Sequence, residues 1–245
     1  MKDKIALVTG GTSGIGKKIV EHLLKENVFV YVNYGHNEEQ KEKARKDFAQ
    51  IRDSFEFIKA DVSNENEVIE MLKIINDKSR KLDYLVNNAG TNIDSFIENA
   101  DMVDYKKIID VNLVGKVMVT KYSFPLLEKG SNAAIVNIAS RLGSMPCVEA
   151  SAYCASAAGI INFTKAAALE FANKKIRVNC VSPSLTITPL ALSGWTDEEI
   201  EEQKNNNPLK RLAETEDIAN TVLFLLSDKA SYINGQNINV NGGTF

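Results

Sequence analysis

Short apolar runs alternate along the chain with longer amphipathic stretches, and this alternation constrains the fold more than any other feature. The runs are rich in valine and isoleucine, as are strands buried on both faces of a sheet. Alternating strand and helix patterns predict an α/β fold, with a doubly wound parallel sheet of about seven strands flanked by helices. We predict strands at Ile5–Val8, Val28–Asn33, Phe55–Ala60, Tyr84–Asn87, Ala134–Ile138, Ile176–Val181 and Asn237–Val240, and the clearest helices at Ser156–Ala172 and Asp217–Leu226.

No repeat, low-complexity segment or linker divides the 245 residues, so we expect residues 1–245 to form a single domain. The least regular stretch is 182–212, which contains three of the five prolines. Within it, Thr196-Asp-Glu-Glu199 has the pattern of a capping box and predicts the start of a short helix. A long insertion of this kind is often a substrate lid, and a passive surface excursion is the alternative.

Composition argues against several classes of partner. With 44% apolar residues, 25% charged residues and a net charge of −3, the chain lacks the basic character expected for binding nucleic acid or an anionic membrane. No apolar run approaches the roughly 20 residues that span a bilayer. Cys147, Cys154 and Cys180 have no metal-ligand spacing, and Ile5 opens a strand pattern with no signal-peptide layout before it. We therefore expect no metal and a reduced, cytoplasmic protein.

A glycine-rich turn follows the first predicted strand and opens the first helix. In Thr9-Gly-Gly-Thr-Ser-Gly-Ile-Gly16, the glycines Gly10, Gly14 and Gly16 allow the backbone to turn sharply and to approach a pyrophosphate. The helix N-terminus beyond them supplies amide donors and the positive end of a dipole. In this position the turn predicts a dinucleotide-binding site.

The end of the second predicted strand bears on which dinucleotide binds. NAD-binding folds usually place an acidic residue there to accept a hydrogen bond from the ribose hydroxyl. Here the strand ends Val32-Asn-Tyr-Gly-His36 without a carboxylate, which favours NADP(H) over NAD(H) because a 2′-phosphate is not repelled. Ser13 supplies no positive charge, so Asn33, Tyr34 and His36 would recognise the phosphate. A plain surface role is the alternative for His36.

Further motifs follow in order along the chain: Asn87-Asn-Ala-Gly90, Asp110-Val-Asn-Leu113, Ile135-Val-Asn-Ile-Ala-Ser140 and then Tyr153. With the glycine-rich turn, they make the chain similar to the short-chain dehydrogenase/reductase family from Lys4 to Gly243, which implies a Rossmann fold. The resemblance implies that Asn112 anchors a proton-relay water by kinking its helix. It also implies that Ser140 hydrogen-bonds a substrate carbonyl and that Tyr153 donates the proton.

The same resemblance implies which residues contact the cofactor. Asp61 would contact the adenine, and capping of the following turn is the alternative for its side chain. The implied set is Gly10, Thr12, Ser13, Gly14, Ile15, Gly16, Asn33, Tyr34, Asp61, Val62, Asn88, Ala89, Gly90, Tyr153, Pro183, Thr186 and Thr188.

The fourth residue after Tyr153 is Ala157, where the family has a lysine. A tyrosine titrates near 10 and is a poor acid–base group at neutral pH. A neighbouring ammonium favours the phenolate by roughly 3–4 kcal/mol at an effective dielectric of about 20, which lowers the phenol pKa by about 2–3. Lys165, roughly 12 Å further along the helix, is too distant to replace it. We therefore expect an impaired catalyst.

Two origins for Ala157 remain open: an engineered knockout and natural divergence. Ser184 and Asn241 also replace a glycine and an aspartate of the family, which slightly favours divergence. A non-catalytic dinucleotide-binding pseudoenzyme, or a subunit that pairs with an active relative, is accordingly the alternative to a reductase.

Within the family, the chain most resembles the β-ketoacyl-acyl-carrier-protein reductases, through Val32-Asn-Tyr34, Asp61-Val-Ser63 and Gly235-Gln236. The resemblance implies NADPH-dependent reduction of a carrier-bound or small-molecule carbonyl, in fatty acid or polyketide biosynthesis. Lys129, Lys174 and Lys175 fall near positions where those enzymes bind the acidic carrier beside the active site. Relatives are mostly tetramers, so we expect a homotetramer or homodimer, built partly from the helices around 101–129 and 151–173.

Overall fold

The computed structural model describes residues 1, 3–193 and 195–244, and its centre is one parallel sheet of seven strands. Their spatial order is β3-β2-β1-β4-β5-β6-β7. Strands β2 and β3 are added on one side of β1 and strands β4 to β7 on the other, so the strand order reverses between β1 and β4. The strands are β1 (Ile5–Val8), β2 (Phe29–Tyr34), β3 (Phe55–Lys59), β4 (Tyr84–Asn87), β5 (Ala134–Ile138), β6 (Arg177–Pro183) and β7 (Asn237–Val240). This is the doubly wound sheet that the alternating pattern predicts.

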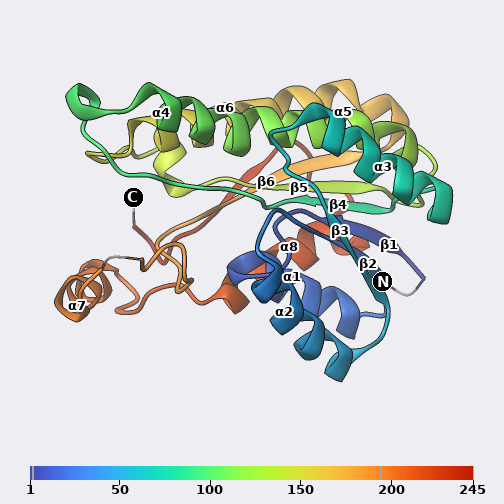
Figure 1. The fold of residues 1–245 in the computed structure, drawn as a ribbon, viewed down its shortest axis with the longest axis horizontal. Helices are drawn as coiled ribbons and strands as arrows, with labels where there is room; N and C mark the ends of the chain where they lie inside the picture. The colour runs from blue at the N-terminus through green and yellow to red at the C-terminus, as the bar shows by residue number, and fades with distance from the viewer. Residues whose placement is uncertain (2, 194, 245) are drawn as a thin grey trace.

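Helices cover both faces of the sheet (Figure 1). One layer holds α1 (Gly14–Lys25), α2 (Glu38–Ile51) and α8 (Thr215–Leu226). The other holds α3 (Glu65–Ser79), α4 (Met102–Ile109), α5 (Gly115–Leu127) and α6 (Ser151–Glu170). A π-helical turn, η2 (Asp110–Val114), joins α4 to α5. Each layer buries its own apolar cluster against the sheet, which explains why the central strands are apolar on both sides.

Most predicted elements are confirmed within one or two residues, and one boundary is wrong. The helix predicted over Ser156–Ala172 begins at Ser151, so Tyr153 lies inside its first turn. The strand predicted over Ile176–Val181 is likewise shifted and ends at Pro183. Apolar periodicity starts late in α6 because its first turn faces the site and not the core.

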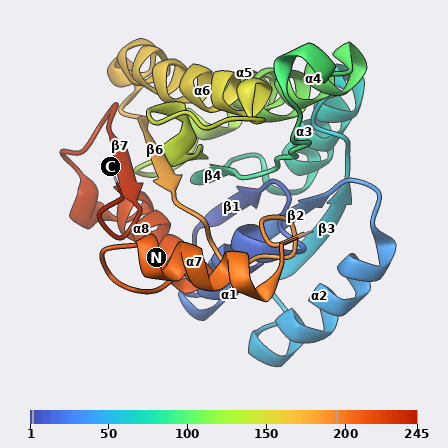
Figure 2. The ribbon, with the colours of Figure 1, turned by 90° about the vertical axis from the view of Figure 1, so that its left-hand side faces the viewer.

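The 182–212 stretch carries α7 (Asp197–Asn206), which lies apart from the two helical layers (Figures 1 and 2). Its capping box is confirmed, because the Thr196 hydroxyl accepts from the Glu199 amide while the Glu199 carboxylate accepts from the Thr196 amide. Within the described residues, no helix combines the length and apolar character needed to cross a bilayer.

Candidate active site and dinucleotide cleft

A cleft of about 230 Å³ opens at the carboxyl ends of the strands, where the order reverses between β1 and β4. Open α/β sheets bind their ligands at such a reversal. The lining comes from the glycine-rich turn, the ends of β2 and β3, and the segment after β4. It consists of Gly10, Thr12, Ser13, Asn33, Tyr34, Gly35, His36, Asn37, Gln40, Ala60, Asp61, Val62, Ala89, Gly90 and Val111.

The glycine-rich turn is pressed against the segment that follows β4. Gly10 has a φ of 61°, a left-handed conformation that favours glycine. The Asn88 side chain donates to the carbonyls of Thr9 at 3.0 Å and Gly10 at 3.1 Å, and the Thr9 hydroxyl accepts from the Asn88 amide at 3.0 Å. A side chain at Gly16 would put its Cβ 2.2 Å from the Gly10 carbonyl oxygen. This backbone cradle, at the N-terminus of α1, fits a pyrophosphate.

Asn33 supports the turn from beneath. Its buried side chain accepts from the Gly10 amide at 3.3 Å and donates to the Ala60 carbonyl at 2.9 Å. The amide is therefore committed to protein partners, and the prediction that it recognises a phosphate does not fit its geometry. Sequence reasoning identified the position but not this role, since both partners are remote in the chain.

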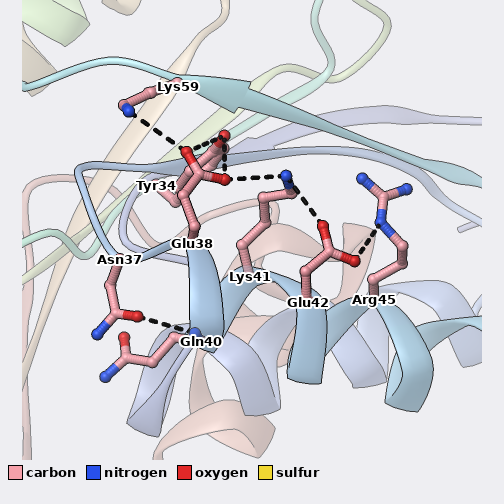
Figure 3. Close-up of polar contacts among 8 residues, drawn as sticks. All are labelled: Tyr34, Asn37, Glu38, Gln40, Lys41, Glu42, Arg45 and Lys59. Carbon is pink, nitrogen blue, oxygen red and sulfur yellow. Dashed lines mark hydrogen bonds and ion pairs between the residues drawn. The ribbon is translucent and has the colours of Figure 1, made fainter.

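One end of the cleft, where the adenosine of a dinucleotide is predicted to bind, lies between β2 and the start of α2 (Figure 3). The Glu38 carboxylate accepts from the Tyr34 hydroxyl at 3.2 Å and from Lys41 at 3.0 Å, and it also pairs with Lys59. Its pKa is lowered, with the hydrogen bond from Lys41 as the largest cause. The Glu38 carboxylate, the first after β2, is therefore paired with lysine ammonium groups and is not among the residues that line the cleft. Asn37 and Gln40 do line it, and sequence reasoning did not single them out.

Asp61 both caps a turn and lines the cleft. Its carboxylate accepts from the amide of Ser63 at 2.9 Å and from the Ser63 hydroxyl at 2.7 Å, and it lies 3.6 Å from His36 Nε2. Burial acts to raise the pKa of this carboxyl, but the Ser63 and His36 hydrogen bonds outweigh it and the pKa is lowered. The capping alternative is therefore confirmed for the side chain, and an adenine contact stays a prediction.

Asn112 lies in the π-helical turn between α4 and α5, so the predicted kink is present. Such turns are frequent at functional sites. The Asn112 amide donates to the Thr91 carbonyl at 2.8 Å and accepts from the Thr91 amide at 2.8 Å. It also reaches the Ser156 hydroxyl on α6 at 3.4 Å, and Ser156 donates to the Tyr153 carbonyl at 2.8 Å. Asn112 therefore ties the first turn of α6 to the segment after β4.

Ser140 and Tyr153 come together at the carboxyl end of β5. The Ser140 hydroxyl accepts from the Leu142 amide at 3.1 Å, which fixes its direction. Burial raises the pKa of Tyr153, while its hydrogen bond with Ser140 acts in the opposite direction. The phenol is therefore protonated at neutral pH but is a weaker acid than a free tyrosine, which agrees with the impaired catalysis expected without a lysine at 157.

Residues after β6 close the other side of the site. Thr188 approaches the glycine-rich turn, because a Cβ at Gly14 would lie 3.2 Å from its methyl group. Thr186 is buried and donates to the Ser184 carbonyl at 2.9 Å, so its hydroxyl is already engaged. Pro183 is buried at the end of β6. The predicted residues of this segment thus flank the cleft, but cofactor contacts for them stay predictions.

The lysines predicted to border the site lie elsewhere in the chain's own fold. Lys174 follows α6 and pairs with Glu128 at the end of α5. Its distance from Tyr153 is roughly 30 Å, at 1.5 Å per helical residue. The expectation that these lysines lie beside the active site is therefore wrong within one chain, because α6 carries Lys174 and Lys175, and α5 carries Lys129, to the far ends of these helices.

Lys116 is a candidate residue that sequence reasoning missed. It is the only buried lysine or arginine in the part of the chain that the structure describes, with 6% of its surface exposed. Its ammonium donates to the Ile138 carbonyl at the end of β5, and none of the ion pairs formed by the described residues involves it. Burial lowers the pKa of Lys116 to about 8. A charged residue inside the apolar run Val111–Val119 is the sequence signal that could have revealed it.

Lys116→Met is expected to stabilise the folded protein by about 3 kcal/mol at pH 7, because a pKa lowered from 10.5 to about 8 measures the cost of the buried charge. Between pH 8 and 10.5 the unfolded state binds more protons than the folded state, so wild-type stability rises with pH in that window. The advantage of the variant should shrink accordingly. Urea unfolding at pH 7 and pH 9.5 measures both effects.

The matched control is Lys121→Met, on the same helix but with a side chain that is 63% exposed. It should change the free energy of unfolding by less than about 0.5 kcal/mol. A Lys116→Met protein that is less stable than wild type at pH 7, or a difference that does not depend on pH, would contradict the prediction.

Known proteins resemble the whole chain. The family model described as Enoyl-(Acyl carrier protein) reductase matches residues 10–244. The chain is 38% identical over 243 residues to the 3-oxoacyl-[acyl-carrier-protein] reductase FabG of Staphylococcus aureus, covering 99% of this chain and 98% of that protein. It is 35% identical to the uncharacterized oxidoreductase YgfF of Escherichia coli, covering 98% of this chain and 99% of that one.

Solved structures of reductases also match the whole chain. A variant of actinorhodin polyketide ketoreductase with NADPH matches at 32% identity and a TM-score of 0.94, covering 99% of this chain and 98% of that one. Levodione reductase matches at 27% identity, with the same TM-score and the same coverage. With full-length matches to the family model and to oxidoreductases above 30% identity, the chain belongs to the short-chain dehydrogenase/reductase family.

Proposed function

We propose that this protein is an NADPH-dependent carbonyl reductase and alcohol dehydrogenase of the short-chain type, acting on β-ketoacyl thioesters. The observation that carries the proposal is the joining of Asn112, Ser140 and Tyr153 at the carboxyl end of the sheet, next to the dinucleotide cleft. Support comes from the relatives, which are reductases of 3-oxoacyl-[acyl-carrier-protein] and a polyketide ketoreductase with NADPH.

Each residue has a defined task in such a reaction. When bound in the cleft, NADPH supplies the hydride that reduces the carbonyl carbon. Negative charge then develops on the carbonyl oxygen, and donors aimed at that oxygen lower the barrier. The Ser140 hydroxyl donates a hydrogen bond to it, and Tyr153, which is protonated at neutral pH, delivers the proton. Asn112 holds the first turn of α6 against the segment after β4 through Thr91 and Ser156.

Turnover is expected to be slower than in relatives that have a lysine at position 157. The buried Ala157 offers no charge to Tyr153 and no hydrogen bond to the cofactor. A pseudoenzyme that only binds the dinucleotide is the second candidate, and this same substitution is the observation that favours it.

The preference for NADPH rests on the adenosine end of the cleft. Neutral or polar groups line it after β2, namely His36, Asn37 and Gln40, and the Glu38 carboxylate is turned towards Lys41 and Lys59. A 2′-phosphate meets less repulsion there than beside a free carboxylate.

Partners follow from the same proposal. The substrate is a carrier-bound or small-molecule thioester. We also infer a homotetramer or homodimer, because large apolar side chains are exposed on the outer helices, including Val103 on α4 and Leu169 on α6. Light scattering after gel filtration measures the assembly directly.

Oxidation of NADPH and of NADH with acetoacetyl thioesters, a simple ketone and a crotonyl thioester tests the function. We expect turnover with the β-keto thioester, at least about 10-fold higher kcat/KM for NADPH than for NADH, and none with the crotonyl substrate, whose carbon–carbon double bond lacks the oxygen that Tyr153 protonates. Tight NADPH binding without turnover of any substrate would instead support the pseudoenzyme.

A further inference from the structure

Two cysteines lie together beside Tyr153. Cys154 follows the tyrosine in the first turn of α6 and is buried, whereas Cys147 is exposed in the segment that joins Ser140 to this helix. The two cysteine side chains are hydrogen-bond partners of each other. The third cysteine, Cys180, is buried in β6. Cys147 and Cys154 therefore form a pair of neighbouring thiols, and not two isolated ones.

The loop that carries Cys147, residues 144–149, is held at both of its ends. Immediately before the loop, the chain packs closely on α6, because a Cβ at Gly143 would lie 2.8 Å from the backbone carbon of Ala157. At the end of the loop, the Ser95 amide donates to the Glu149 carbonyl at 2.7 Å. These contacts keep the 144–149 loop close to the first turns of α6.

The backbone after Cys147 turns the chain back into the helix. Glu149 has a φ of 64°, a left-handed conformation that is uncommon outside glycine and occurs at chain reversals. The next residue, Ala150, accepts through its carbonyl from the Cys154 amide at 2.8 Å. A disulfide between the two cysteines would thus close a short ring, residues 147–154, whose backbone already folds back on itself.

We propose that Cys147 and Cys154 form a reversible disulfide, which fixes the 144–149 loop on the first turn of α6 and slows the reduction of substrate. The bond itself depends only on the two thiols, whereas its effect on turnover rests on the proposed reductase function. The loop joins Ser140 to Tyr153, so fixing it restricts how these two side chains adjust to a substrate carbonyl. Disulfides that form in reduced compartments are usually transient and redox-sensing, which fits such a device.

A hydroperoxide is the oxidant. The Cys147 thiolate attacks one peroxide oxygen, so that an S–O bond forms, the O–O bond breaks and, from hydrogen peroxide, one water leaves. The Cys154 sulfur then attacks the sulfenic sulfur of Cys147. The S–S bond forms, the S–O bond breaks, and the hydroxide leaves with the remaining thiol proton as a second water. Two thiols are oxidised, one peroxide is reduced, and a dithiol reverses the reaction.

The groups around Cys147 set the pH at which it reacts. Burial is the largest cause of its raised pKa, and Cys154 on α6 and Asp94 after β4 act in the same direction, while Arg141 opposes them. The thiolate is the reactive form, so oxidation should be slow at pH 7. The rate should rise about 10-fold for each pH unit up to pH 9, because each unit increases the thiolate fraction about 10-fold below the pKa.

Hydrogen peroxide is the probe for the disulfide, and free thiols and peptide masses are the readout. Oxidised wild type should keep one of its three thiols, and its tryptic peptide 142–165, which contains both cysteines, should become lighter by two hydrogens. Cys154→Ala cannot close the bond, so it should accumulate a sulfenic acid at Cys147 that dimedone traps. Cys180→Ala is the matched control and should form the disulfide as wild type does.

Two further measurements follow the effect of the bond. Oxidation should lower kcat/KM for a β-keto thioester at least about 10-fold, and dithiothreitol should restore it. NADPH affinity should stay within about twofold, because neither cysteine lines the dinucleotide cleft. Cys147→Ser, a change at an exposed position, should keep its activity in peroxide. Independently of turnover, amides 144–149 should exchange hydrogen at least about 10-fold more slowly in the oxidised chain.

The proposal is overturned if peroxide leaves peptide 142–165 with both thiols free, or links Cys147 only to a second chain. It is also overturned if the disulfide forms while hydrogen exchange and kcat/KM stay unchanged, or if Cys147→Ser is inhibited as strongly as wild type. If neither the reduced nor the oxidised chain turns over any carbonyl, the reductase function fails. The peptide mass and the exchange of the loop amides then still decide whether the disulfide forms and fixes the loop.

Discussion

Tyr153→Phe is expected to lower kcat with a β-keto thioester by about 10³-fold, because a positioned general acid contributes about 10²- to 10⁴-fold. Phenylalanine keeps the ring and removes only the hydroxyl. Tyr153 lies in the first turn of α6, where the backbone carbonyl of the tyrosine accepts from Ser156 in either variant, so the helix should be unchanged. Steady-state kinetics with saturating NADPH measures the loss.

The control for this variant is Tyr232→Phe, since Tyr232 is fully exposed and remote from the cleft. It should leave kcat unchanged, and Tyr153→Phe should bind NADPH within about threefold of wild type. A loss of kcat smaller than 10-fold would show that another group delivers the proton.

Gly16→Ala is expected to prevent dinucleotide binding and to lower the free energy of unfolding by about 3 kcal/mol. The added Cβ would lie 2.2 Å from the Gly10 carbonyl oxygen and 2.4 Å from the Asn88 side-chain nitrogen. The φ of Gly16 is not in the left-handed region, so the cost of the added Cβ is steric and not conformational. Either the turn or Asn88 must move, and both form the cradle proposed for the pyrophosphate.

Thermal unfolding and NADPH titration by fluorescence measure the two effects of this change. The stability control is Gly35→Ala, because a Cβ there meets no atom within 4 Å. An alanine at 16 that leaves both the midpoint of unfolding and the NADPH affinity unchanged would mean that the turn is not held as tightly as its contacts indicate.

These two variants separate two properties of the site. Gly16 concerns the binding of the cofactor, and Tyr153 concerns the proton.

Local patterns predicted much of the fold and of the candidate site. Seven apolar runs indicated the seven strands, and the glycine-rich turn between β1 and α1 indicated the cleft. The capping box at Thr196 is also confirmed, because it depends on residues within one turn, and the kink at Asn112, which the family resemblance implied, is present as a π-helical turn. Boundaries were less certain where a helix end faces the site, as at Ser151.

Other features could not be predicted because they depend on contacts between remote parts of the chain. Asn33 looks like a cleft residue in sequence, but its partners at Gly10 and Ala60 commit it to supporting the turn. From the sequence, Glu38 is an acidic residue in the first turn of a helix, as is common. In the structure, Tyr34, Lys41 and Lys59 bind its carboxylate and hold it away from the cleft.

By itself, the sequence determined the order of strands and helices, the glycine-rich turn, and the presence of Asn112, Ser140 and Tyr153 without a lysine at 157. Only the tertiary structure decided which lysine is buried. Lys116 carries the same charge as Lys121 on the same helix, and the two differ because the side of α5 that carries Lys116 packs against the sheet. Burial is a property of the packed helix and sheet, so the chemistry that burial gives to Lys116 arises only once the fold has formed.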